Sequence, residues 1–213
     1  MSLKHYLQLA YKEVGLTPSP ELHAIQPLIG TLHPNRENLL LVYGGSFNPP
    51  HRGHIEVLLS GLHPAISPVA IVILPSEDWH LRSKISTSHP SFFLSQKRRA
   101  GLLHAIEVIP RDRVWVWTTT WYPFKPFTEA LLRLTKKDGF ELSFARLVGP
   151  DNLDVEDPCN IMPFAFPGVL VTNRARHVDG HFLEDGKPVV WNGFGEWERS
   201  TPGGGDGQCM CCF

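Results

Sequence analysis

The feature that most constrains the fold is the stretch from residue 39 to residue 59, where an apolar run, a turn and a helical pattern follow one another. Leu39–Tyr43 is short, apolar and followed directly by glycines, which predicts a buried β-strand. Ile55–Leu59 fits the first turns of a helix. Between them the chain reads Gly44-Gly45-Ser46-Phe47-Asn48-Pro49-Pro50-His51-Arg52-Gly53-His54. The order is therefore a strand, a glycine-rich turn and the start of a helix.

This turn has the composition of a phosphate-binding site. Glycine lets a backbone approach a phosphate without a Cβ in the way, and the first turn of a helix offers unpaired N–H groups and a partial positive charge. His51 and His54 lie three residues apart at that helix end, so both side chains can face one anion. Histidines that were merely exposed would not explain why glycines, prolines and both imidazoles share one turn. We therefore expect the phosphates of a nucleotide to bind here.

Strand and helix patterns alternate through the centre of the chain and predict an α/β fold. The later predicted strands are 69–74, 114–117, 143–148, 168–172 and a weaker one at 187–191. The predicted helices are 53–62, 91–108 and 126–136, and the polar residues 76–90 predict a loop. Continuous apolar strands separated by helices indicate a Rossmann-like, doubly wound parallel sheet that is covered on both faces.

The two ends of the chain differ from this central region. Residues 3–14 have the apolar spacing of an amphipathic helix, and residues 21–32 predict a second short helix with Pro27 as a kink or boundary. From about residue 200 the chain is rich in glycine and cysteine, which predicts a disordered tail. The expected organisation is an N-terminal helical extension over 1–37, a single α/β domain over 38–199 and a tail over 200–213. The extension is expected to brace the domain or to bind a partner.

Composition and charge exclude several kinds of partner. The formal net charge is −1, so no basic field indicates DNA or RNA. No run of about 20 apolar residues predicts a transmembrane helix, and the first residues lack the apolar core of a signal peptide. Of the 4 cysteines, most lie in the last few residues, which suits a reducing compartment rather than a disulfide framework. We expect an intracellular protein of the cytoplasm and/or nucleus, and the sequence leaves a homo-oligomer open.

The central turn also carries a resemblance. Gly45-Ser46-Phe47-Asn48-Pro49 followed by His51-x-Gly53-His54 resembles the signature of the nucleotidylyltransferase superfamily. Its Ser-Phe-Asn-Pro part looks most like the nicotinamide mononucleotide adenylyltransferase branch. The resemblance covers residues 38–195 and implies a nucleotidyltransferase domain. It implies nucleotide binding by Gly45, Ser46, Phe47 and Gly53, and catalysis by His54 and, less surely, His51.

Further residues match the family at the predicted strand ends, where an open α/β sheet binds its ligands. Gly149 and Asp151 resemble a G-x-D element on the nucleoside side of the ligand, although Asp151 alone could equally cap a helix. Trp121 matches an aromatic position against the nicotinamide, with a core tryptophan as the alternative. Arg174 matches a basic phosphate contact after the fifth strand, with a solvated arginine as the alternative.

The segment after the second strand carries several cations. Lys84 resembles a phosphate-contacting lysine of the family, and Arg82 competes with it for that assignment. Arg98 and Arg99 resemble an arginine of the next helix that points to the site, whereas the alternative is a solvated face shared with Lys97.

The function implied by the resemblance is transfer of AMP from ATP to nicotinamide mononucleotide, giving NAD and pyrophosphate. Mg²⁺ is implied on the triphosphate, and no residues have the spacing of a structural zinc site. The family's second signature, of the type I-S-S-T-x-x-R, has no counterpart after Arg174. Two alternatives therefore stay open: a related enzyme with another phosphorylated acceptor, and a catalytically impaired nucleotide-binding or scaffold protein of the same fold.

Overall fold

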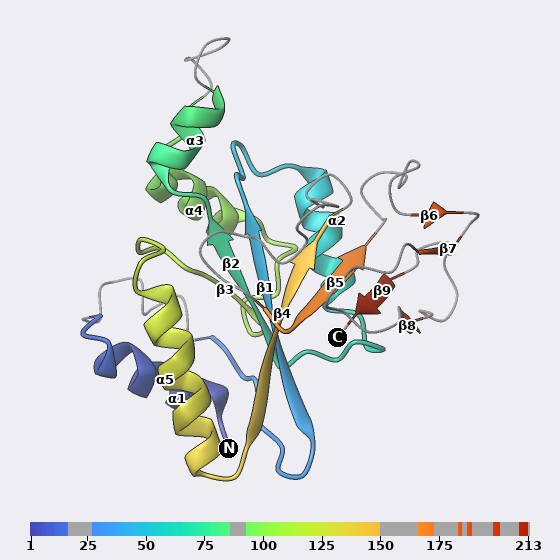
Figure 1. Ribbon diagram of the computed structural model, residues 1–213. Coiled ribbons are helices and arrows are strands. Elements are labelled where there is room, and N and C mark those ends of the chain that lie inside the picture. The colour runs from blue at the N-terminus through green and yellow to red at the C-terminus, as the bar shows by residue number, and fades with distance from the viewer. Residues whose placement is uncertain are drawn as a thin grey trace.

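The computed structural model describes residues 1–16, 27–85, 93–149 and 166–172, together with the backbone of four short strands nearer the C-terminus. Its centre is a parallel sheet in the order β3-β2-β1-β4-β5 (Figure 1). The strands are β1 (Glu37–Gly45), β2 (Ala70–Pro75), β3 (Val114–Val116), β4 (Glu141–Val148) and β5 (Gly168–Thr172). This order confirms the predicted Rossmann-like α/β fold.

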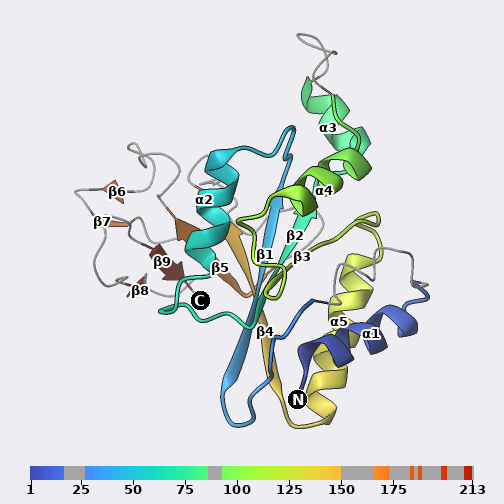
Figure 2. The same cartoon turned by 180° about the vertical axis from the view of Figure 1, so that it is seen from behind.

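Helices cover both faces of the sheet (Figures 1 and 2). Along β1, Leu40 and Val42 face one core and Leu41 and Tyr43 face the other, because successive side chains of a strand alternate. The first core is closed by α1 (Leu3–Glu13) and α5 (Phe124–Lys137), and the second by α2 (Arg52–Gly61) and α4 (Gln96–Ala105). Burial on both faces explains why the strands have continuous apolar sequences.

The N-terminal segment packs onto the sheet domain. Residues Leu3, Tyr6, Leu7 and Ala10 of α1 are fully buried in the core shared with α5. The predicted helix over 21–32 is wrong for residues 27–32: they run as an irregular segment, and residues 17–26 lie outside the described parts. The backbone of this segment bonds to distant residues instead, since Gly30 O accepts from Leu3 N–H at 2.8 Å. The boundary at residues 37 and 38 stays a prediction.

Residues 76–90, predicted as a loop, contain a helix, α3 (Asp78–Ile85). Leu81 is its buried residue, so α3 has no apolar stripe that a periodicity argument could find. Asp78 in its first turn and Arg82 and Lys84 in its last turn complement the helix dipole. Residues 86–92 lie outside the described parts. The next helix, α4, is shorter than the predicted 91–108.

The C-terminal strands depart from the expected pattern. Cys209–Cys212, in the tail expected to be disordered, forms β9 and pairs antiparallel with β5, while β8 (Glu198–Ser200) pairs with β9. Of the predicted strand 187–191, the structure describes β7 (Lys187–Pro188), which pairs with β6 (Leu183–Glu184) outside the main sheet. Among the described residues, no helix is both long enough and apolar enough to cross a membrane.

Candidate functional site

The candidate site lies at the carboxyl ends of the parallel strands. The strand order reverses beside β1, because the chain builds β2 and β3 on one side of it and β4 and β5 on the other. Ligands of doubly wound sheets bind at such a reversal point. Gly45 ends β1 and Gly149 directly follows β4, so both predicted glycines lie at this edge, with Gly149 buried.

The turn after β1 is held by the side chain of Phe47. Its φ of 49° is in the left-handed region, and its ring is fully buried, 5.2 Å from the Tyr43 ring in an edge-on contact. A Cβ added at Gly45 would lie 3.0 Å from Phe47 Cζ, which is closer than side chains normally approach. Gly45 is therefore required for the ring to fold beneath the turn, and the buried ring fixes the backbone on either side of it, at Ser46 and beyond.

The two histidines lie in contact at the start of α2. His51 precedes the helix, and its backbone N–H donates to Nδ1 of His54 at 3.2 Å. The two imidazole rings stack with centroids 3.7 Å apart, and the centroid of the Phe47 ring lies 4.8 Å from that of His54. Because Nδ1 accepts a hydrogen bond, a neutral His54 carries its proton on Nε2. The ring therefore offers an N–H donor at a helix N-terminus, with Gly53 as the second residue of that helix.

Arg99 of α4 holds the turn from inside the protein. Its side chain is fully buried, and its guanidinium donates to Ser46 O at 2.6 Å, to Ser76 O at 2.7 Å and to Asp78 Oδ1 at 3.0 Å. Its Nε donates to Leu94 O at 2.9 Å. Burial lowers the pKa of Arg99, and the Asp78 carboxylate opposes that shift. Arg99 thus joins the ends of β1 and β2 to the starts of α3 and α4.

Sequence reasoning missed this role. Arg99 was expected either to point to the site or to lie on a solvated face. It is fully buried, so the solvated interpretation is wrong for it, and its guanidinium points to the turn at Ser46. Its neighbour Arg98 is exposed, as the solvated alternative states. Its neighbours in space, Ser76 and Asp78, are distant in sequence and form no motif with it. A buried arginine needs hydrogen-bonding partners. The sequence shows two adjacent arginines on a predicted helix, but it does not show which of the two is buried.

Trp121 lies on the β2 and β3 side of the same edge. Its indole Nε1 donates to Pro75 O at 2.9 Å, and its backbone N–H donates to the carboxylate of Glu77 at 2.5 Å. The imidazole of His80 lies 5.8 Å from the indole, and its pKa is lowered by burial and by the positive charge of Lys84. Lys84 itself is exposed on the last turn of α3. The structure therefore brings Trp121 and Lys84 to one side of the candidate site.

Two predicted site residues, Asp151 and Arg174, lie outside the described residues. The structure consequently brings together the turn from Gly45 to His54, Gly149, Trp121 and the Lys84 helix at one edge of the sheet. The roles assigned to these residues stay predictions.

Comparison with known proteins finds a family that resembles the central part of the chain. Residues 42–145, from β1 into β4, match the family described as cytidylyltransferase-like. The chain is similar to that family over this stretch, which is slightly less than half of its length. The match includes Gly45, Phe47, His51 and His54, so the turn that resembles a nucleotidylyltransferase signature belongs to the matched region.

Comparisons with individual proteins add little to this family match. No curated protein matches this chain. A solved structure from Vibrio parahaemolyticus, named as a nicotinate-nucleotide adenylyltransferase, shares 20% sequence identity with a TM-score of 0.31. The alignment covers 54% of this chain and 63% of that chain, which is less than two thirds of the relative's length. The cytidylyltransferase-like assignment therefore rests on the family match and on the strand order of the sheet.

Proposed function

We propose that this chain is an adenylyltransferase that transfers AMP from ATP to nicotinamide mononucleotide, giving NAD and pyrophosphate. The observation that carries the proposal is the fixed imidazole of His54. Its Nδ1 accepts from His51 N–H, and its ring contacts the rings of His51 and Phe47 at the N-terminus of α2. A donor held in one orientation beside a helix N-terminus stabilises negative charge that grows on a phosphate.

The proposed reaction needs no covalent intermediate with the protein. An oxygen of the acceptor's 5′-phosphate attacks the α-phosphorus of ATP in line. A new P–O bond forms as the bond from the α-phosphorus to the α,β-bridging oxygen breaks, and pyrophosphate leaves with that electron pair. The attacking phosphate is already an anion, so the site needs positioning and charge neutralisation rather than a general base.

In this scheme the turn and the histidines share the α-phosphate. Nε2–H of His54 donates to a non-bridging oxygen, with His51 as a second donor, and the backbone around Ser46 and Phe47 fixes the nucleotide. The buried Phe47 ring and the Arg99 bond to Ser46 O keep this backbone in place before the ligand arrives. Preorganisation of this kind lowers the cost of ordering the site at the transition state.

Mg²⁺ fits this site as an ion that ATP carries. The described carboxylates that directly follow β2, Glu77 and Asp78, already accept from Trp121 N–H and from Arg99. Phosphate oxygens and water are the remaining ligands that a hard divalent cation prefers. When bound, the metal neutralises charge on the triphosphate, while the chain's own residues orient the phosphates.

Trp121 favours nicotinamide mononucleotide over other acceptors. The nicotinamide ring of the mononucleotide is planar and positively charged. The face of an indole stacks on planar rings and attracts cations. The indole is fixed by its bond to Pro75 O, so it offers a rigid surface on the β2 side of the site. A related enzyme with a different phosphorylated acceptor remains the second candidate.

The absence of an I-S-S-T-x-x-R motif after Arg174 favours a third candidate, a nucleotide-binding or scaffold protein with impaired catalysis. Pyrophosphate release from the purified full chain separates the three candidates. ATP, Mg²⁺ and nicotinamide mononucleotide form the first reaction, with CTP and other phosphorylated acceptors alongside. Release that depends on nicotinamide mononucleotide supports the proposal. Release with another acceptor alone selects the second candidate, and no release with any pair selects the third.

The role of His54 has its own test. His54→Ala is expected to lower pyrophosphate release by about 100-fold or more, which is typical of removing one donor to a developing oxyanion. His5→Ala is the matched control, because His5 is exposed on α1 on the other side of the molecule. Both variants should melt near the wild-type temperature. Unchanged activity in His54→Ala would remove His54 from the mechanism.

A further inference from the structure

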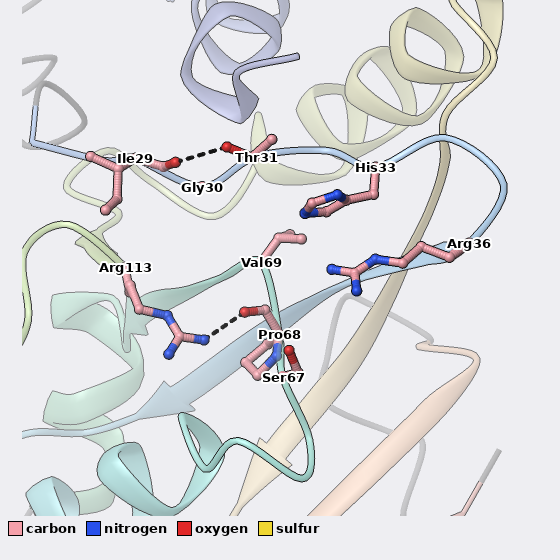
Figure 3. Close-up of a pocket in the computed structure, with 9 residues that line it drawn as sticks. All are labelled: Ile29, Gly30, Thr31, His33, Arg36, Ser67, Pro68, Val69 and Arg113. Carbon is pink, nitrogen blue, oxygen red and sulfur yellow. Dashed lines mark hydrogen bonds between the residues drawn. The ribbon is translucent and has the colours of Figure 1, made fainter.

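A cavity of about 210 Å³ lies at the amino-terminal edge of the sheet, opposite the candidate nucleotide site. It is lined by the segment before β1, the segment before β2 and Arg113, the residue directly before β3 (Figure 3). The lining residues are Ile29, Gly30, Thr31, His33, Arg36, Ser67, Pro68, Val69 and Arg113. Figure 3 shows Arg113 on one side of Pro68 and Val69, and His33 and Arg36 on the other side.

The walls of this cavity are held by buried groups. Asn38, only 1% exposed, accepts from His33 N–H at 2.8 Å and donates to His33 O at 3.0 Å and to Arg36 O at 3.1 Å. These bonds fix the turn that carries both side chains. On the opposite wall, Arg113 donates from Nη2 to Pro68 O at 2.8 Å, so its guanidinium is anchored at the rim. The cavity is therefore built on rigid backbone rather than formed by exposed chains alone.

Positive charge in this cavity is not balanced by its lining. Two guanidinium groups and an imidazole line it, and no carboxylate does. Within the described residues, neither Arg36 nor Arg113 forms a salt bridge. The anchoring bond of Arg113 occupies one N–H group of a guanidinium that carries five. The remaining donors can bind an anion, and an anion would also relieve the repulsion among the cationic groups.

We propose that this cavity is a second binding site for a small multivalent anion with phosphate or carboxylate groups. Arg36 and Arg113 bind it from opposite walls, and His33, Thr31 and Ser67 add polar contacts at the rim. A guanidinium presents paired N–H groups that match the oxygens of a phosphate or a carboxylate. The cavity volume suits an anion of a few heavy atoms rather than a whole dinucleotide.

The proposed site is separate from the nucleotide site. The cavity adjoins the first residues of β1, β2 and β3, whereas the phosphate-binding turn follows their last residues. At about 3.3 Å per residue, even the short strand β2 places the two sites roughly 20 Å apart. One ligand cannot span both, so this inference stands whether or not the proposed function is correct.

The test is equilibrium binding by calorimetry to the full chain, at constant ionic strength. Inorganic pyrophosphate is the phosphate probe and citrate the carboxylate probe. Arg36→Ser removes an exposed cationic side chain whose backbone is held by Asn38, so folding should be preserved. Lys137→Ser is the control, because it removes the same charge from the exposed end of α5 without touching the cavity lining.

At least one probe is expected to bind the wild-type chain, and Arg36→Ser should weaken that binding by about fivefold or more. Lys137→Ser should change it less than twofold. Equal effects of the two variants, or no binding of either probe, would overturn the proposal. Pyrophosphate held at the nucleotide site would instead be weakened by His54→Ala and unaffected by Arg36→Ser. These variants therefore distinguish failure of this site from failure of the proposed function.

Discussion

Replacing Arg99 with methionine should destabilise both the fold and the turn after β1. Methionine keeps much of the side chain's length but removes the guanidinium, which is fully buried. The change leaves the carbonyl oxygens of Ser46, Ser76 and Leu94 without the donors that they now have. It also removes the cation that pairs with Asp78. The ends of two strands would lose their link to the helices behind them.

The expected loss follows from these partners. Removing one member of a buried, hydrogen-bonded ion pair typically costs about 3–5 kcal/mol. Asp78 is 42% exposed, so water can take over part of its hydrogen bonding, and the ion-pair contribution must be discounted. Ser76 is only 4% exposed, so its carbonyl oxygen has little access to water, and a buried unsatisfied group costs about 1–3 kcal/mol. We therefore expect a loss near 3 kcal/mol, which is a large share of the roughly 5–15 kcal/mol that stabilises an ordinary domain.

Urea denaturation at neutral pH measures this loss directly. Arg98→Met is the matched control, because Arg98 is the exposed neighbour on the same helix, and its loss should stay within about 0.5 kcal/mol. Arg99→Lys should fall between the two, since lysine keeps the charge but lacks the fork that reaches several acceptors at once. Equal free energies of unfolding for Arg99→Met and Arg98→Met would refute the anchoring role. If Arg99→Met does not fold, the Arg99→Lys comparison still decides the question.

Three further predictions come from close contacts in the core. Gly45→Ala places a Cβ 3.0 Å from Phe47 Cζ and should lower both stability and pyrophosphate release, whereas Gly44→Ala, whose nearest neighbour would be Leu74 O at 4.0 Å, should be better tolerated in a thermal melt. Gly61→Ala meets Leu147 Cδ2 at 2.6 Å and should destabilise the chain despite alanine's helix preference, whereas Gly101→Ala meets nothing within 4 Å and should stabilise it by up to about 1 kcal/mol in urea denaturation. Burial and a 2.7 Å bond to Asp138 raise the pKa of Tyr6 from 10.0 to about 12. The folded chain therefore keeps this proton where the unfolded chain loses it, so the free energy of unfolding should fall as pH rises from about 10 to 12. Tyr6→Phe should make that fall shallower, and an unchanged slope would contradict the assigned cause.

The sequence was sufficient for the parts of the fold that local patterns encode. The apolar run of β1 and the glycines after it predicted a strand, a turn and a helix, and all three are present, while phosphate binding by the turn stays a prediction. Helix α3 was missed because Leu81 is its single buried residue, so its sequence has no helical repeat of apolar residues. The irregular course of residues 27–32 was missed because its backbone partners lie elsewhere in the chain, at Leu3 and Asp112 among others. Hydrogen bonds between segments that are far apart in the sequence cannot be predicted from the residues of one short stretch.

The same distinction applies to the candidate site. The residues expected to touch a ligand, such as His51 and His54, form a contiguous motif and were found by their spacing. Arg99 shapes the site by contacting backbone oxygens, and a carbonyl oxygen is present on every residue. Any residue type can supply such an oxygen, so the sequence contains no characteristic pair of residues from which the contact could be predicted. Only coordinates show that α4 supports the turn after β1.

The two halves of the proposed ATP site therefore differ in what they can contribute. The α-phosphate half is preorganised, because Phe47, Arg99 and the His51–His54 contact fix it without a ligand. The resembled family binds the β- and γ-phosphates through its second signature, of the type I-S-S-T-x-x-R, and residues 175–213 contain no such motif. Contacts to those phosphates that are equally strong in the ground and transition states affect KM alone, whereas contacts that strengthen as pyrophosphate leaves also affect kcat. An active chain with a high KM for ATP and an ordinary kcat would mean that the missing motif supplies mainly binding. A low kcat at saturating ATP would mean that it normally stabilises the departing pyrophosphate, which the histidines at the α-phosphate cannot replace.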